Sequence, residues 1–201
     1  MNLYTMLQKR EAEGRPLRLG LIGAGKFAAM YLAQVPKTPG IHLAGIADLS
    51  PANARTNLER VGWAAESFSA PTLDAALKHR RTHVGENWEA LVAHPAIDIV
   101  IEATGNPEAA VSHVLGAFRN GKHVVNVTVE ADCMCGPLLA RRAEEAGVVY
   151  SLAYGDQPAS SAIWSIGRAP PASASSRPGA ATSGCRTSRN PRPRPCGVTT
   201  A

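Results

Sequence analysis

A cluster of small residues near the N-terminus has the spacing of a phosphate-binding turn. Residues 23–28 read Gly-Ala-Gly-Lys-Phe-Ala, a G-x-G-x-x-A pattern, directly after the apolar run 17–22. In such a turn the first glycine allows the tight bend, the second lets the backbone approach a pyrophosphate, and the small last residue permits close packing of helix and strand. The pyrophosphate lies on the free N–H groups at the start of the helix. This pattern predicts a dinucleotide site that includes Gly23, Ala24, Gly25, Lys26 and Phe27.

An acidic residue stands where the second apolar run ends. Asp48 follows the run 42–47, 20 residues after Ala28, where a carboxylate accepts hydrogen bonds from the adenosine ribose. Together with the glycines this is a specific signal, whereas the glycines alone would also fit a chance turn in an unrelated α/β fold. Asp48 favours NAD because it repels a 2′-phosphate, yet Arg55 is close enough downstream to compensate, unless it only faces solvent. The choice between NAD and NADP stays open.

A second turn follows a β-branched run, residues 97–103. Asn106 is placed to cap a helix that begins with Pro107. The turn comes at the carboxyl end of its strand, where open α/β sheets bind ligands, so its backbone would line the nicotinamide ribose. The alternative is a simple strand-to-helix connection. The predicted residues of this part of the cofactor site are Ala103, Thr104, Gly105 and Asn106.

Alternating apolar runs and helical patterns surround both turns. This alternation predicts a parallel sheet with right-handed crossovers, a doubly wound α/β domain of the Rossmann type with about six strands. The expected strands are residues 17–22, 42–47, 82–84, 97–103, 124–127 and 148–152. The expected helices are residues 26–35, one opened by Ser50-Pro51, 73–81, 86–93, 108–119 and 132–146. Residues 1–16 are predicted to contain a short docking helix, over residues 2–13.

The charge of the chain is unevenly distributed. The 201 residues carry 21 Lys and Arg and 16 Asp and Glu, for a net charge of +5. Six of the Arg, and no acidic residue, lie in residues 161–201, so residues 1–160 hold 15 basic and all 16 acidic side chains. The nearly neutral charge of residues 1–160 therefore does not favour nucleic-acid binding by the domain. A nucleic-acid binder that uses the Arg-rich tail is a minor alternative.

No other pattern predicts a site. No apolar run approaches the roughly 20 residues of a membrane helix, and charged residues fill the N-terminus, so we expect a cytoplasmic protein without membrane contact. Cys133 and Cys135 lack the partners of a zinc site, and His79 with His83 reads as a solvated helix end. We expect no metal.

Five segments carry a resemblance to a known family: residues 19–25, 98–107, 121–127, 128–132 and 154–158. They resemble the homoserine dehydrogenase-like NAD(P)-dependent oxidoreductases, in particular the branch with deoxyxylulose-phosphate reductoisomerase-like proteins that carry a SAF domain. The resemblance implies hydride transfer between a nicotinamide cofactor and a small hydroxy or keto substrate, in a homo-oligomer. It also implies that the catalytic lysine and acid lie in a second domain, so no catalytic residue is expected in this chain. A non-catalytic dinucleotide-binding or sensing module is the alternative.

The resemblance ends near residue 160, where the composition changes. Residues 161–201 are rich in Ser, Ala, Pro and Arg and contain no acidic residue, a composition typical of disorder. In a frame shifted by one base, however, they can read as a helical pattern and a strand with a glycine turn. We therefore expect a frameshift near Ser160 that truncates the protein, with a genuine disordered tail as the alternative. The expected organisation is a docking helix in residues 1–16, an NAD(P)-binding domain in 17–160 and a disordered tail in 161–201.

Overall fold

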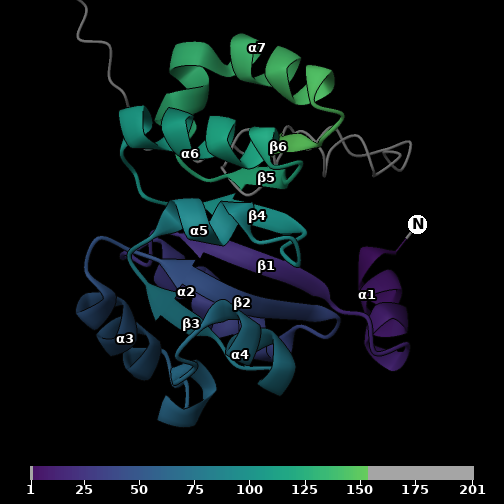
Figure 1. Ribbon diagram of the computed structural model, residues 1–201, viewed down its shortest axis with the longest axis vertical. Coiled ribbons are helices and arrows are strands. Elements are labelled where there is room, and N and C mark those ends of the chain that lie inside the picture. The colour runs from purple at the N-terminus through teal and green to yellow at the C-terminus, as the bar shows by residue number, and fades with distance from the viewer. Residues whose placement is uncertain (1, 154–201) are drawn as a thin grey trace, which may run out of the picture. The chain divides into compact units, whose positions relative to one another are not determined.

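Parallel strands form the centre of the molecule. The computed structural model describes residues 2–153. Its sheet has six strands in the order β3-β2-β1-β4-β5-β6, all paired in parallel (Figure 1). The strands are β1 (Leu17–Ile22), β2 (Ile41–Ala47), β3 (His83–Gly85), β4 (Ile99–Glu102), β5 (His123–Asn126) and β6 (Tyr150–Leu152). The order reverses between β1 and β4, as in the doubly wound Rossmann fold, which confirms the predicted fold class.

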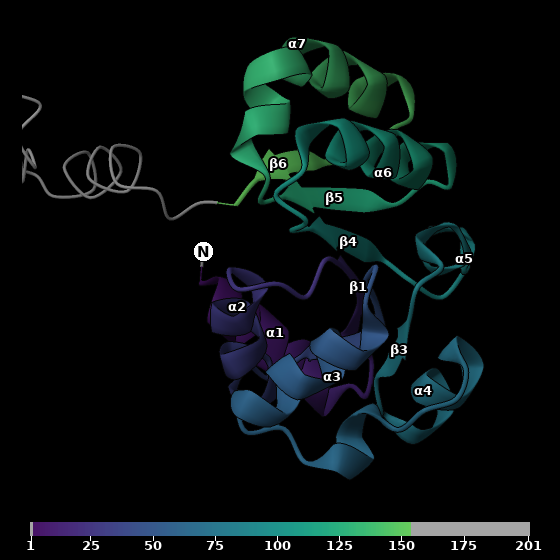
Figure 2. The ribbon, with the colours of Figure 1, turned by 90° about the vertical axis from the view of Figure 1, so that its left-hand side faces the viewer.

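Helices connect the strands and cover both faces of the sheet. They are α1 (Leu3–Ala12), α2 (Ala28–Gln34), α3 (Pro51–Arg60), α4 (Leu73–His79), α5 (Trp88–Ala93), α6 (Pro107–Arg119) and α7 (Val129–Glu145). Two short 3₁₀ helices span Val35–Lys37 and Ala65–Phe68. Helices α2 and α3 lie on one side of β1 to β3, and α4 and α5 lie on the other (Figure 2). The crossovers thus leave the carboxyl ends of β1, β2 and β4 uncovered by these helices.

The core consists of two apolar layers, one on each face of the sheet. In one layer Leu32 of α2 and Leu58 of α3 pack with Leu21 of β1, and all three are fully buried. In the other layer α5, α6 and α7 contribute side chains such as Val114 and Leu139, which pack against Val100 and its neighbours. Both faces of the central strands are covered, which is why those strands read as continuous apolar runs rather than as alternating ones.

The structure confirms every predicted strand and helix of the domain, and the differences are at their ends. Residues 25–27 belong to a turn, so α2 begins at Ala28 rather than at residue 26. Helix α7 begins at Val129, three residues before the predicted start, and is kinked at Cys135, where the backbone is not helical. The kink precedes Pro137, whose ring clashes with the preceding turn and which has no N–H to continue the helix.

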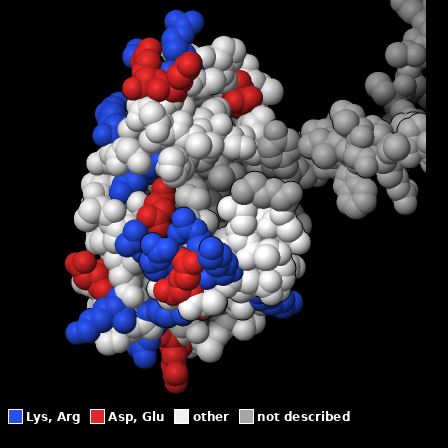
Figure 3. Space-filling view, turned by 90° about the vertical axis from the view of Figure 1, so that its right-hand side faces the viewer, with Lys and Arg blue, Asp and Glu red and all other residues white. Residues whose placement is uncertain are grey.

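Polar contacts hold α1 in place. Glu11 accepts hydrogen bonds from the backbone N–H of Gly40, at 3.0 Å, and from the guanidinium of Arg80, at 3.0 Å. None of the α1 residues is buried, and the apolar Leu3 is 73% exposed. On the face that carries α1, basic and acidic side chains lie side by side, without separation by sign (Figure 3).

The remaining predictions concern the C-terminal tail and contact with a membrane. The expected tail, residues 161–201, lies outside the described residues, as does the end of the predicted domain after Ala153. Within the described part, none of the helices is long and apolar enough to cross a membrane.

Candidate functional site

The first turn of the predicted site, which follows β1, lies against the second turn, which follows β4. Gly23 has φ of 89°, and a Cβ built there would lie 2.8 Å from the carbonyl carbon and oxygen of Ala103 and from Cα of Thr104. A side chain at this position would both strain the backbone and clash with the second turn. The absence of a side chain at Gly23 therefore allows the two predicted turns to lie in contact.

The remaining residues of the first turn face outward. Gly25, Lys26 and Phe27 are exposed, and a Cβ built on Gly25 would meet nothing within 4 Å. Among the described residues, the backbone N–H groups of these three make no hydrogen bond. Ala28 behind them is 1% exposed and packs in the core. Three outward N–H groups at a helix start form a ready site for an anion such as a phosphate.

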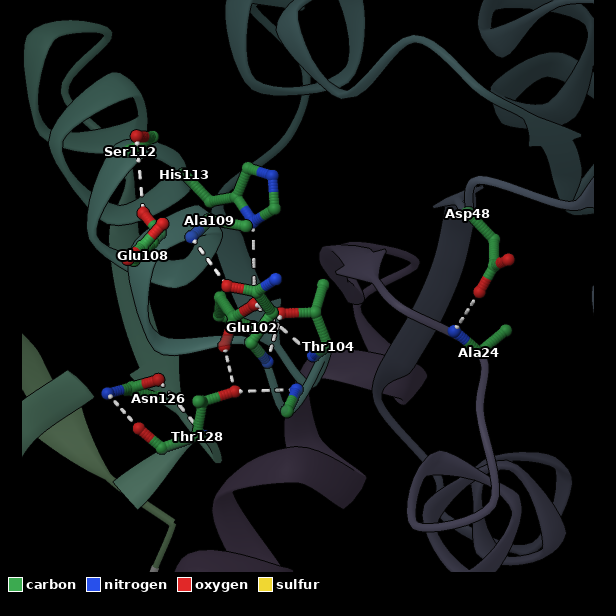
Figure 4. Close-up of polar contacts among 12 residues, drawn as sticks. Ala24, Asp48, Glu102, Thr104, Glu108, Ala109, Ser112, His113, Asn126 and Thr128 are labelled. Atoms are coloured by element: carbon green, nitrogen blue, oxygen red, sulfur yellow. Dashed lines mark hydrogen bonds and ion pairs between the residues drawn. The ribbon is translucent and has the colours of Figure 1, made fainter. Parts of the chain in front are cut away.

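Asp48 is held at the end of β2 beside the first turn. Its Oδ2 accepts a hydrogen bond of 2.7 Å from the backbone N–H of Ala24 (Figure 4). Its Oδ1 accepts one of 2.8 Å from the backbone N–H of Ser50. The side chain of Asn57 donates to the carbonyl of Ala24 at 2.8 Å and fixes the turn from the other side. Each carboxylate oxygen has a second lone pair, so a half-exposed Asp48 is able to accept further bonds from hydroxyl groups.

A shallow surface pocket adjoins Asp48 at the ends of β2 and β3. Its lining includes Leu49, which is 99% exposed, and Arg55. The guanidinium of Arg55 donates to the carbonyl of Val84 at 3.1 Å, so this cation is tied to the β3 end of the pocket. An exposed leucine next to Asp48 provides an apolar surface on which a flat ring could pack.

The second predicted turn has one conformational requirement and one cap. Gly105 has φ of 72°, which favours glycine. The side chain of Asn106 accepts a hydrogen bond of 3.1 Å from the N–H of Ala109 and so caps α6, which confirms its predicted capping role. Pro107 occupies the first turn of that helix. The structure therefore assigns the Asn106 side chain to the helix, while the exposed backbone of residues 104–106 remains at the site.

A buried acid that the motifs did not identify lies beneath the second turn. Glu102, the last residue of β4, is 0% exposed. Its Oε1 accepts bonds from the hydroxyl of Thr104 at 2.5 Å and from Nδ1 of His113 at 3.4 Å, and its Oε2 accepts one from the hydroxyl of Thr128 at 2.5 Å (Figure 4). The signal in the sequence was a charged residue inside an apolar, β-branched strand. Such a residue is almost never buried unless it is paired.

The environment of Glu102 stabilises its charged form. Burial alone raises the pKa of the carboxyl group, but the hydrogen bonds from His113, Thr104 and Thr128 outweigh it and hold the pKa below its usual value. Every one of these contacts places a donor against the carboxyl group, which is what a carboxylate needs. The ring of His113 packs edge-on against Trp88, with centroids 4.7 Å apart, and this fixes the histidine.

A second buried network continues from β5 to α7. The side-chain amide of Asn126, which is 0% exposed, donates to the hydroxyl of Tyr150 at 3.1 Å. That hydroxyl donates to Oδ1 of Asp132 at 3.0 Å. Asn126 also exchanges hydrogen bonds with the backbone of Thr128. The two networks meet at Thr128, so polar contacts join the carboxyl ends of β4 and β5 to Tyr150, the first residue of β6.

The structure thus brings the sequence-predicted residues of the first turn, Asp48 and the second turn to one edge of the sheet. The described residues contain no group of three side chains that could hold a metal ion. At this edge the first turn has N–H groups without a partner among the described residues, and a carboxylate lies beside it. The second turn exposes its backbone.

Several solved structures are similar to this chain. A homoserine dehydrogenase from Thiobacillus denitrificans has 23% sequence identity and a TM-score of 0.53, with 68% of this chain and 29% of that chain covered. A biliverdin reductase from Synechocystis sp., solved with biliverdin and NADP+, has 26% identity and a TM-score of 0.48, with 68% and 37% covered. A putative oxidoreductase from Klebsiella pneumoniae has 24% identity and a TM-score of 0.49, with 68% and 33% covered. This chain therefore spans about a third of the length of these structures.

The family comparison covers the whole described sheet. No curated protein matches the chain. Residues 19–152, however, match the family described as "Homoserine dehydrogenase, NAD binding domain", from within β1 to the end of β6. The match includes both turns, Asp48 and the buried Glu102. The chain belongs to the family of the homoserine dehydrogenase NAD-binding domain, whose cofactor is NAD(P).

Proposed function

We propose that the carboxyl edge of β1, β2 and β4 binds NAD(P), and that the chain is the cofactor domain of an oxidoreductase acting on a small hydroxy or keto compound. The observation that carries this proposal is the set of outward N–H groups at residues 25–27 beside the carboxylate of Asp48. Family membership supports it. The bound nicotinamide supplies or accepts the hydride, and the protein supplies binding and orientation.

Each part of the chain has a distinct task in this proposal. The N–H groups of residues 25–27 hold the pyrophosphate, with the exposed Lys26 adding positive charge nearby. Asp48 accepts hydrogen bonds from the adenosine ribose, and Leu49 lies against the adenine. The backbone of residues 103–105 lines the nicotinamide ribose. Gly23 keeps the two turns close enough for one extended cofactor to reach both.

We propose NAD as the preferred cofactor. Asp48 is anchored by two backbone N–H groups next to the ribose position, where its charge would repel a 2′-phosphate. Arg55 is the nearby cation that could compensate, but its guanidinium is bonded to the carbonyl of Val84. A 2′-phosphate would have to compete with that bond.

We also propose that this chain binds the cofactor without turning over a substrate. Glu102 and His113 are the acid–base side chains beneath the second turn, and they are 0% and 8% exposed. They face each other at 3.4 Å, so neither is free to exchange a proton with a substrate on the surface. The acid–base groups would then come from another part of the protein. Turnover of a hydroxy or keto compound by the purified 201-residue chain would overturn this proposal.

Titration of the purified chain with NADH, followed by nicotinamide fluorescence, tests the site. We expect saturable binding that is weaker for NADPH. In Gly25→Val the new side chain fills open space, so the fold should keep its melting temperature, while affinity should fall at least tenfold because the pyrophosphate has lost its place. Ala140→Val, on the exposed face of α7, is the matched control and should change neither. Equal NADH affinity in Gly25→Val and the wild type would contradict the assignment.

A further inference from the structure

The three N–H groups of the second turn are directed to one buried carboxylate. The N–H of Thr104 donates to Glu102 directly, at 3.2 Å. The N–H of Gly105 donates to the hydroxyl of Thr128 at 3.0 Å, and the N–H of Asn106 donates to the hydroxyl of Thr104 at 3.3 Å. Because each hydroxyl accepts from the turn, its own proton is available for Glu102, and both hydroxyls lie 2.5 Å from the carboxylate.

Successive N–H groups that converge in a turn form a concavity that binds anions. Here the protein's own carboxylate, at the end of β4, satisfies these groups directly and through the two threonines (Figure 4). The second turn therefore offers no free N–H group to a phosphate. The first turn differs, since the N–H groups of residues 25–27 have no partner among the described residues.

The carbonyl groups of the second turn point the other way. In a trans peptide the C=O of one residue and the N–H of the next are directed oppositely, and the described chain has no cis peptide. Inward N–H groups at residues 104–106 therefore require outward carbonyls at residues 103–105. Among the described residues, none of these three carbonyls accepts a hydrogen bond. The carbonyl of Ala103 faces Gly23, which leaves those of Thr104 and Gly105 for a ligand.

We propose that Glu102 is a positioning residue that sets the hydrogen-bonding polarity of the second turn. It turns the N–H groups inward and the carbonyls outward, so the turn accepts hydrogen bonds from the hydroxyl and amide groups of the nicotinamide half of the cofactor and rejects phosphate. The pyrophosphate is thereby confined to residues 25–27. This inference rests on the proposed binding of NAD(P) and adds what directs each half of the cofactor to its turn.

Glu102→Gln is the direct test. The glutamine keeps the shape of the side chain but places an NH₂ group where a carboxylate oxygen accepted a hydrogen bond. The hydroxyl at that position loses its acceptor, which breaks the relay from the turn N–H to residue 102. We expect NADH affinity to fall at least tenfold, as for the loss of a hydrogen bond to a charged group. ADP, which lacks the nicotinamide half, should bind within about twofold of the wild type. Glu108→Gln, exposed in the first turn of α6, is the matched control and should leave both affinities unchanged.

The pattern of the two affinities decides the outcome. Equal losses for NADH and ADP in Glu102→Gln would make Glu102 a structural residue only and overturn the proposal, as would unchanged NADH affinity. If Glu102→Gln does not fold, Thr104→Val, at an exposed position, removes one relay hydroxyl and should show the same selective loss for NADH. A wild-type chain that binds NADH, together with a Glu102→Gln variant that loses NADH and ADP affinity equally, refutes the inference alone. A wild-type chain that does not bind NADH refutes the proposed function as well.

Discussion

The two glycines of the first turn are required for different physical reasons. Gly23 is required by the fold, because its backbone is left-handed and a Cβ would lie 2.8 Å from the backbone of Ala103. A Cβ built on Gly25 would have no atom within 4 Å, and the φ angle of Gly25 lies outside the left-handed region. The fold therefore does not require a glycine there, and under the proposed function its small size leaves room for the pyrophosphate. A substitution at Gly23 tests stability, and one at Gly25 tests binding.

Protonation of Glu102 should weaken the fold in acid. Its folded pKa lies below the unfolded value of 4.5, so its contribution to stability is complete above that pH and is lost as the pH falls through the lower, folded value. The free energy of unfolding should therefore fall by up to about 1.4 kcal/mol per pH unit from this group. Urea unfolding of the wild type and of Glu102→Gln between pH 6 and pH 3 measures this contribution of Glu102 to the free energy of unfolding. The difference between the two proteins should shrink below pH 4.5.

Glu108→Gln is again the reference, since its exposed carboxyl group has no such donors. The difference between the wild type and this control should not depend on pH in the same way. If the free energy of unfolding of the wild type instead rose relative to that of Glu102→Gln as the pH fell, Glu102 would be protonated in the folded protein. The assignment of four donors to its carboxylate would then be wrong.

Residue types and spacing predicted the parts of the site that lie close together in the sequence. The glycine turn, Asp48 and the second turn could all be identified that way, because each follows its own strand. Glu102 could not be assigned a partner, since Thr128 and His113 come from other elements and only the strand order brings them together. The Asn106 cap was also predictable from the sequence, because the capping residue and the Pro107 that begins the helix are adjacent in the chain.

At the scale of elements, the site depends on where strands end and helices begin. β1 pairs with β2 on one side and β4 on the other, so their carboxyl ends lie at one edge. The starts of α2 and α6 follow immediately. Strand and helix identity could be predicted from apolar runs, but the ends of α2 and α7 could not. The helix start at Ala28 and the kink at Cys135 depend on contacts and on backbone geometry rather than on periodicity.

The start of α6 should depend on the Asn106 cap. Asn106→Ala removes the acceptor for the N–H of Ala109, so the free energy of unfolding should fall by about 1 kcal/mol. Asn106→Asp keeps a capping oxygen and should retain both stability and NADH affinity. Thermal unfolding of both variants checks this, with Asn53→Ala, on the exposed surface of α3, as the control. A stable Asn106→Asp that binds NADH poorly would show that the amide contacts the cofactor.

At the scale of the molecule, the proposed site spans the two halves of the sheet. The first turn and Asp48 follow strands β1 and β2, while the second turn and Glu102 belong to β4. Ala24 of the first turn and Ala103 of the second turn pack with the same apolar layer, the one that contains side chains of α2 and α3. A cofactor that touches both turns therefore bridges the switch point of the sheet, where the strand order reverses.

Two tryptophans can report on the layers separately. Trp63 packs against the first layer and donates to the carbonyl of Leu32 at 2.8 Å, and Trp88 packs against the second. In a chain with Trp164→Phe, Trp63→Phe leaves Trp88 as the reporter and Trp88→Phe leaves Trp63. Both should show the same urea midpoint if the domain unfolds as one unit.

Saturating NAD+ should then raise the two midpoints together. At 100 times the dissociation constant the added stability is about 2.7 kcal/mol, and it applies to the whole domain when the two layers unfold together. In Glu102→Gln the same NAD+ concentration should add less, because only the contacts at the first turn and Asp48 remain. A midpoint that rises for Trp63 but not for Trp88 would show that the two layers unfold separately and that the cofactor stabilises only the layer that Trp63 reports.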